Sequence, residues 1–126
     1  MIVQDWSIYP NFRRDEFGCK CGCGRAEMRT EFMGKLQALR MVWDKPMIIT
    51  SGYRCVNHPA ERLKPMSGTG THSQGIAADI GVSGADALTL LRLALEANFS
   101  GVGIQQKGHG RFVHLDIREH PAIWSY

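Results

Sequence analysis

The sequence lacks long hydrophobic runs, internal repeats and a strong net charge. No apolar stretch approaches the roughly 18 residues that a membrane-spanning helix needs. The first residues also lack the basic region and apolar core of a secretory signal. The formal net charge of +3 is too small to predict nucleic-acid binding, although it suits an acidic polymer. We therefore expect a protein that is synthesised in the cytoplasm and has neither a membrane nor a nucleic acid as its partner.

The length and composition fit one globular domain over residues 1–126. Hydrophobic residues make up 44% of the chain and charged residues 21%, both close to the averages of globular proteins. A chain of this size buries roughly two-thirds of its unfolded surface, which suffices for one core but not for two. We expect a single domain, and we expect it to be a monomer.

The chain has four cysteines, and three of them are clustered. Cys19, Cys21 and Cys23 alternate with other residues, whereas Cys55 stands alone. The C-x-C-x-C spacing differs from the paired C-x-x-C of a zinc ribbon, so it indicates structural zinc only weakly. The lack of an export signal favours reduced thiols. A metal site, a disulfide and a glycine-rich loop with buried or half-buried thiols all remain compatible with this pattern.

Apolar residues recur at helical spacing in two segments. In the first, Thr30 is a suitable N-cap with Glu31 in the first turn, and Pro46 ends the helix. Its apolar stripe consists of Phe32, Leu36, Leu39 and Trp43. In the second, Ser83 offers an N-cap with Asp86 three residues later. We expect the apolar face of this second helix to consist of Leu88, Leu91 and Leu95.

Short apolar segments flanked by turn residues are typical of β-strands. Four such segments lie at residues 47–50, 76–82, 101–106 and 111–117. Turn residues at 107–110, two of which are glycines, join the last two into a predicted hairpin. Residues 51–72 show no periodicity and form a long predicted loop, of a length that is usually functional. We therefore predict an α+β fold, with a small, mostly antiparallel sheet and flanking helices.

A histidine and an aspartate share one face of the fourth predicted strand. Side chains alternate along a strand, so His114 and Asp116 point away from the apolar face. That apolar face consists of Val113, Leu115 and Ile117. Polar groups next to a core are stable where they meet water, each other or a metal. An ordinary half-exposed strand shows the same pattern, so this strand alone does not predict a site.

A second histidine–aspartate pair leads into the second predicted strand. His72 and Asp79 are separated by six residues that include Gly75 and two alanines, so another element can pack closely there. Neutral imidazole and carboxylate are both good zinc ligands. With His114, the pair supplies two histidines and one aspartate, a ligand set that leaves the fourth position of zinc open for water. Such an open position is typical of catalytic rather than structural zinc.

Three motifs in this order resemble the zinc D-Ala-D-Ala carboxypeptidase family. They are Ser-Gly-Tyr-Arg-Cys at residues 51–55, His72 with Asp79, and Phe-Val-His-Leu-Asp-Ile-Arg at residues 112–118. The resemblance covers nearly the whole chain. The family includes vancomycin-resistance D,D-peptidases, L-alanyl-D-glutamate endopeptidases of phage endolysins and, by fold, the hedgehog signalling domain. The resemblance implies a fold of this kind, with Zn²⁺ bound by His72, Asp79 and His114.

The same resemblance suggests residues that contact the substrate. Arg54 stands where the family has an arginine that holds a substrate carboxylate or the developing oxyanion. A planar guanidinium suits both roles better than a lysine would. Tyr53 and Gln74 are further candidates for substrate binding. His58 and His120 each neighbour a proline, and we expect both at the surface.

The general base is the point where this sequence departs from the better-known members. Those members carry Glu, His or Asp two or three residues before the last ligand, where this chain has Phe112 and Arg111. Neither side chain accepts a proton at neutral pH. Asp116 is the nearest carboxylate, and we nominate it either as the base or as the partner that orients His114. His109, between two glycines, is the competing candidate for the base.

These features together predict a zinc metallopeptidase that acts on peptidoglycan. Zinc-activated water would hydrolyse stem-peptide amide bonds, as in a D-Ala-D-Ala carboxypeptidase or an L-Ala-D-Glu endopeptidase. We expect action at the cell wall or in the periplasm, and a phage or a bacterial origin fits equally. Two alternatives stay open: a non-catalytic, zinc-containing wall-binding module of the same fold, and a metal or redox protein built on the four cysteines.

Overall fold

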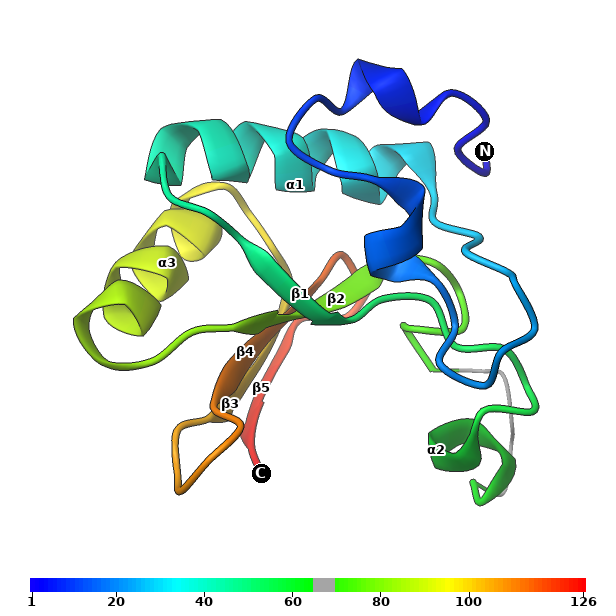
Figure 1. Cartoon of the computed structure of the whole chain (residues 1–126). Coiled ribbons are helices and arrows are strands. Elements are labelled where there is room, and N and C mark those ends of the chain that lie inside the picture. Colours follow the sequence, from blue (N-terminus) through cyan, green and yellow to red (C-terminus); the bar gives the residue numbers. More distant parts are fainter. Residues whose placement is uncertain (65–69) are drawn as a thin grey trace.

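The computed structural model describes residues 1–64 and 70–126, and its centre is a five-stranded sheet (Figure 1). The strands are β1 (Ile48–Ser51), β2 (Ala77–Gly81), β3 (Gly101–Gln105), β4 (Phe112–Asp116) and β5 (Ala122–Ser125). They are ordered β1-β2-β4-β3-β5 across the sheet. Neighbouring strands are antiparallel except for β3 and β5, which are parallel. The predicted α+β class and the hairpin between β3 and β4 are therefore confirmed.

Two longer helices lie on one side of this sheet, where they pack against each other (Figure 1). The helices of the described residues are α1 (Thr30–Trp43), α2 (Pro59–Arg62) and α3 (Gly84–Glu96), with short 3-10 helices η1 (Trp6–Ile8) and η2 (Arg14–Phe17) before them. The single-turn α2 lies apart from α1 and α3. Within the described residues, none of these helices has the length and apolarity needed to cross a membrane.

The predicted apolar stripe of α1 is buried in the core. Its members are Phe32, Leu36, Leu39 and Trp43. The helix begins at Thr30, so that the N-cap is Arg29 rather than Thr30, and no side chain caps the first turn. Glu31 lies in the first turn as expected and pairs with the amino terminus of the chain. The residues that face the sheet were thus predictable, whereas the start of the helix differs by one position.

The predicted apolar face of α3 is wrong for two of its three leucines, whereas Leu91 is partly buried and packs against the core. Leu88 is 70% exposed and Leu95 is 53% exposed, whereas Leu90 is completely buried. Ala87 and Ala94 share the buried face with Leu90. The leucines of α3 occur on several sides of the helix, so their spacing alone is compatible with more than one apolar face. The stripe that contains two alanines is the one that packs, because small side chains let the helix approach its neighbours closely.

Two elements lie where no regular structure was predicted. The edge strand β5 was not predicted because its sequence lacks the apolar alternation that marks a half-buried strand. Its one aliphatic side chain of appreciable size, Ile123, is exposed. The short α2 interrupts the predicted loop of residues 51–72, and Glu61 of this helix is buried. Residues 65–69 of the same predicted loop lie outside the described part of the chain.

Candidate metal centre

The centre of the site is one row of residues across the sheet. The register places Asp79 of β2 beside His114 of β4, His114 beside Gly103 of β3, and Gly103 beside Trp124 of β5. A Cβ atom on Gly103 would lie 2.6 Å from Nε1 of Trp124. Because Gly103 leaves this space free, the Trp124 indole reaches the His114 ring, with ring centroids 4.9 Å apart.

His72 comes from the turn that leads into β2. Gly75 closes this turn with a φ of +74°, a conformation that favours glycine, and its missing side chain makes room for the Glu27 carbonyl. The Nδ1–H group of His72 donates to the carbonyl oxygen of Gly52 at 2.8 Å. Nε2 is then the nitrogen that faces the other candidate ligands, and it lies 3.3 Å from Oδ1 of Asp79.

His114 is held through its other nitrogen. Its Nε2–H group donates to Oδ2 of Asp116 at 2.7 Å, and its Nδ1 lies 3.0 Å from Oδ1 of Asp79. One donor atom from each of His72, Asp79 and His114 lies within 4.8 Å of the other two, and all three side chains are buried. In metal sites the second ring nitrogen of a histidine ligand is usually tied to a carbonyl or a carboxylate, and both histidines have such a partner here. The donor set therefore fits a zinc ion.

Hydrogen bonds at this site shift the pKa values of Asp79 and His114 in opposite directions. Burial raises the pKa of Asp79, but hydrogen bonds from His114 and His72 outweigh it and hold that pKa well below its usual range. Burial lowers the pKa of His114, yet the hydrogen bonds to Asp116 and Asp79 outweigh it, so the net pKa lies above its ordinary value. A cation that replaces the proton between His114 and Asp79 would meet the carboxylate of Asp79, whereas Asp116 holds the opposite nitrogen of the His114 ring.

Asp116 lies behind His114 and is completely buried. Its Oδ1 accepts hydrogen bonds from the backbone N–H and Nε of Arg118, both at 3.0 Å. Its Oδ2 accepts from His114 and from Nη2 of Arg118, the latter at 2.6 Å. Burial raises the pKa of Asp116, but these hydrogen bonds lower it well below the usual range. Gly101 makes this position possible, because a Cβ atom there would collide with the carboxylate.

A cavity of about 730 Å³ opens above the three candidate ligands. Three cations line it: Arg54, Lys64 and Arg118. Arg54 is held by Ser51 Oγ at 3.2 Å and lies 3.6 Å from Oδ2 of Asp79. The guanidinium of Arg118 stacks on the Trp124 ring, 4.5 Å from its centroid. The cavity thus combines the buried donor set with three cationic side chains at its walls, of which Lys64 pairs with Glu61 and Arg118 with Asp116.

Only some of the other predicted site residues lie at the cavity. Gln74 lines the cavity, as Arg54 does. Tyr53 is buried in a separate hollow, where the Arg25 guanidinium lies 5.4 Å from its ring centroid. His109 is exposed in the turn between β3 and β4 and does not line the cavity.

Sequence reasoning missed part of the cavity wall. Glu119, His120, Trp124 and Tyr126 all line the cavity. They follow β4 in a segment without a motif, and β5 was not predicted, so only the proximity of this segment to the last ligand could have indicated them. His120 is exposed, as expected, but it faces the site.

Two histidines and one aspartate on the floor of an open cavity define a centre of the metallopeptidase kind. The chain belongs to the peptidase M15 family, whose model matches residues 10–116. Members of this family are zinc-dependent peptidases, so the family and the donor set agree. A search of curated proteins finds no match.

Proposed function

We propose that the protein is a zinc metallopeptidase that hydrolyses amide bonds in peptidoglycan stem peptides. The observation that carries the proposal is the convergence of His72, Asp79 and His114 beneath a cation-lined cavity in a chain of the M15 family. When bound there, zinc supplies a Lewis acid that lowers the pKa of water to about 7 and polarises the scissile carbonyl. The bond cleaved is that of a D-Ala-D-Ala carboxypeptidase or of an L-Ala-D-Glu endopeptidase, and the place of action is the cell wall.

The cationic walls of the cavity suit a substrate that carries carboxylates. Stem peptides present such groups at D-Glu and at the terminal D-Ala. Arg54 is the best placed to bind one, because its side chain is only 20% exposed and is already oriented by Ser51 and Asp79. Lying beside the ligand Asp79, the same guanidinium is also suited to stabilise negative charge that develops on the carbonyl oxygen. Lys64 and Arg118 also line the cavity, where they are paired with Glu61 and Asp116.

Asp116 serves as a positioning residue in this proposal. Both of its oxygens already accept hydrogen bonds, and the carboxylate does not line the cavity. Its hydrogen bond fixes the tautomer of His114 that leaves Nδ1 free to bind the metal. Of the two roles considered from the sequence, orientation of His114 is the one that the geometry supports.

The proton acceptor is then a residue at the cavity wall. Apart from the three proposed ligands, Glu119 and His120 are the described cavity-lining side chains that can accept a proton near neutral pH. We assign the role of base to this pair, at a carboxylate oxygen of Glu119 or a ring nitrogen of His120.

The test is incubation of the zinc-loaded protein with purified peptidoglycan and analysis of the fragments by mass spectrometry. Free D-Ala identifies a carboxypeptidase, and a cut between L-Ala and D-Glu identifies an endopeptidase. Glu119→Gln and His120→Ala, compared with the exposed and distant Glu96→Gln as a control, identify the base. Full zinc occupancy without cleavage of either bond refutes the peptidase proposal, and retained binding to the wall would then favour the non-catalytic module.

A further inference from the structure

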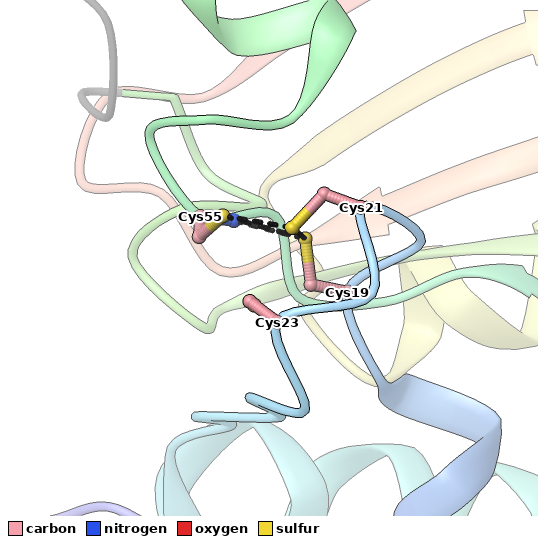
Figure 2. Close-up of side chains that lie close together, drawn as sticks. All are labelled: Cys19, Cys21, Cys23 and Cys55. Carbon is pink, nitrogen blue, oxygen red and sulfur yellow. Dashed lines mark hydrogen bonds between the residues drawn. The ribbon is translucent and has the colours of Figure 1, made fainter.

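Four cysteine thiols gather around Cys55, which follows Arg54 in the chain, and the proposed peptidase chemistry does not use them. Figure 2 shows Cys19 and Cys21 of one loop meeting Cys55, with Cys23 of the same loop beside them. The sulfur–sulfur distances are 3.4 Å for Cys19–Cys21, 3.6 Å for Cys19–Cys55 and 3.3 Å for Cys21–Cys55. All four sulfur atoms lie within 4.8 Å of one another. We propose that they form a second, structural site that binds one zinc ion through four thiolates.

The sulfur geometry matches a tetrahedral zinc site. A zinc–sulfur bond of about 2.3 Å gives a sulfur–sulfur edge of about 3.8 Å in a tetrahedron. The three shorter separations lie slightly below this edge, and Cys23 has only to approach by a small movement. A disulfide instead requires one pair at about 2.05 Å and leaves the other thiols out. Here Cys19, Cys21 and Cys55 are almost equally spaced, so no pair is singled out.

The loop is folded so that its thiols point to one place despite the unusual C-x-C-x-C spacing. Gly22 and Gly24 have φ angles of +87° and +78°, in the left-handed region where glycine is favoured. The chain therefore reverses tightly, and the backbone N–H of Cys19 donates to the carbonyl of Arg25 at 2.8 Å. The backbone N–H of Cys55 points to the sulfur of Cys19 at 3.4 Å. A hydrogen bond to sulfur favours the thiolate, which is the form that binds zinc.

The burial of the thiols fits a structural ion near the surface. Cys19 and Cys55 are buried, whereas Cys21 and Cys23 are exposed. A metal can thus reach the cluster from solvent, while the two inner ligands are fixed by the protein. All four ligand positions are filled by sulfur, which leaves no open position for a substrate.

This second zinc ion would stabilise the wall of the proposed active site. In the segment 52–55, the Gly52 carbonyl holds His72, Arg54 faces Asp79, and Cys55 belongs to the thiol cluster. The other three thiols belong to a loop that follows η2 directly. The ion would therefore fasten the N-terminal loop to the segment that orients one ligand and the substrate-binding arginine. The metal site itself does not depend on the proposed peptidase activity.

The test counts metal ions and identifies their ligands in the full chain. The protein is reduced without oxygen, freed of metal by a chelator and titrated with Co²⁺, which shows thiolate-to-cobalt charge-transfer bands when sulfur binds it. We expect two ions per chain in the wild type. His72→Ala should lose one ion and keep the charge-transfer bands. Cys21→Ser should lose one ion together with these bands. Because Cys21 is exposed, this substitution should leave the packing of the hydrophobic core unchanged.

Lys20→Ser is the matched control, because Lys20 is exposed in the same loop and offers no thiol. It should bind two ions and show the same bands as the wild type. A reduced wild type that shows no charge-transfer bands overturns the proposal, and so does a Cys21→Ser variant that keeps them. A disulfide found by thiol trapping of freshly isolated protein also overturns it. Failure of peptide cleavage leaves these readouts unchanged, so the two proposals fail separately.

Discussion

Replacement of Asp116 by asparagine tests whether this residue orients a metal ligand or acts as the base. The side chain is fully buried, and its two oxygens together accept hydrogen bonds from His114 and Arg118. An amide keeps only one of these oxygens. If the remaining oxygen faces His114, the NH₂ group meets the donors of Arg118. If the amide turns over, the NH₂ group meets the Nε2–H of His114. Either orientation places donors against donors in a buried site.

The expected magnitude follows from these contacts. A buried donor without a partner costs about 1–3 kcal/mol, and removal of one member of a buried ion pair costs up to about 5 kcal/mol. We expect Asp116→Asn to lower the free energy of unfolding by about 3 kcal/mol, which is about 10 °C in Tm for a chain of this length. Loss of the partner of a histidine ligand weakens metal binding by about 10–100-fold. In free energy this is about 1.4–2.8 kcal/mol.

The assay combines thermal unfolding of the metal-free protein with zinc affinity measured by chelator competition. Asp86→Asn is the matched control, because Asp86 is exposed on α3 and pairs only with Lys45 in the contacts that the structure shows. Its effect on unfolding should stay within about 0.5 kcal/mol. If Asp116→Asn keeps its stability and zinc affinity while kcat falls, Asp116 is the base and our reasoning about its two oxygens is wrong.

Three further predictions concern pH, the core and the sheet. In metal-free protein the pKa of His114 lies above its ordinary value of 6.5, because its carboxylate partners outweigh burial. Its stabilising contribution is therefore complete below pH 6.5 and is lost as the pH rises through the raised value. The difference in unfolding free energy between wild type and H114N should then shrink as the pH rises above 6.5 through the raised pKa, and a constant difference would contradict the shift. Leu90→Ala should cost about 2–5 kcal/mol in chemical denaturation, whereas Leu88→Ala stays within about 0.5 kcal/mol; equal effects would disprove the assigned face of α3. Gly103→Ala should displace Trp124, with a change in tryptophan fluorescence and a loss of about 1–3 kcal/mol, and unchanged spectra and stability would show that the sheet accommodates the methyl group.

The candidate ligands could be predicted because their signals are local. Strand alternation placed His114 and Asp116 on one face, and the β4 register confirms that both lie opposite the apolar residues. The pairing of β2 with β4 then brings Asp79 beside His114. That pairing follows from a predicted α+β sheet only when the strand order is known, so the convergence of His72 with the other two was an expectation from family resemblance rather than from spacing.

The supports of the site could not be predicted because they depend on long-range packing. Gly52 offers its carbonyl to His72, and Gly101 leaves space for Asp116. Nothing in the sequence around either residue indicates these roles. Both are glycines, and a glycine is equally compatible with a turn. The wall formed by Trp124 was missed for a related reason: an exposed edge strand shows no apolar alternation, and its parallel pairing with β3 appears only in the fold.

The two proposed metal sites have a physical connection in the short segment between them. Four consecutive residues contact His72 through a carbonyl, η2 through a backbone N–H, Asp79 through a guanidinium and the thiol cluster through a sulfur. A segment without regular structure holds its position only through such contacts, because no ladder of backbone hydrogen bonds supports it. Loss of the thiol-bound ion would remove the contact at one end while leaving the ligands of the other ion intact. Arg54 faces Asp79 and directly precedes Cys55 in the chain, so its orientation, and with it the affinity for a substrate carboxylate, should respond to both ions.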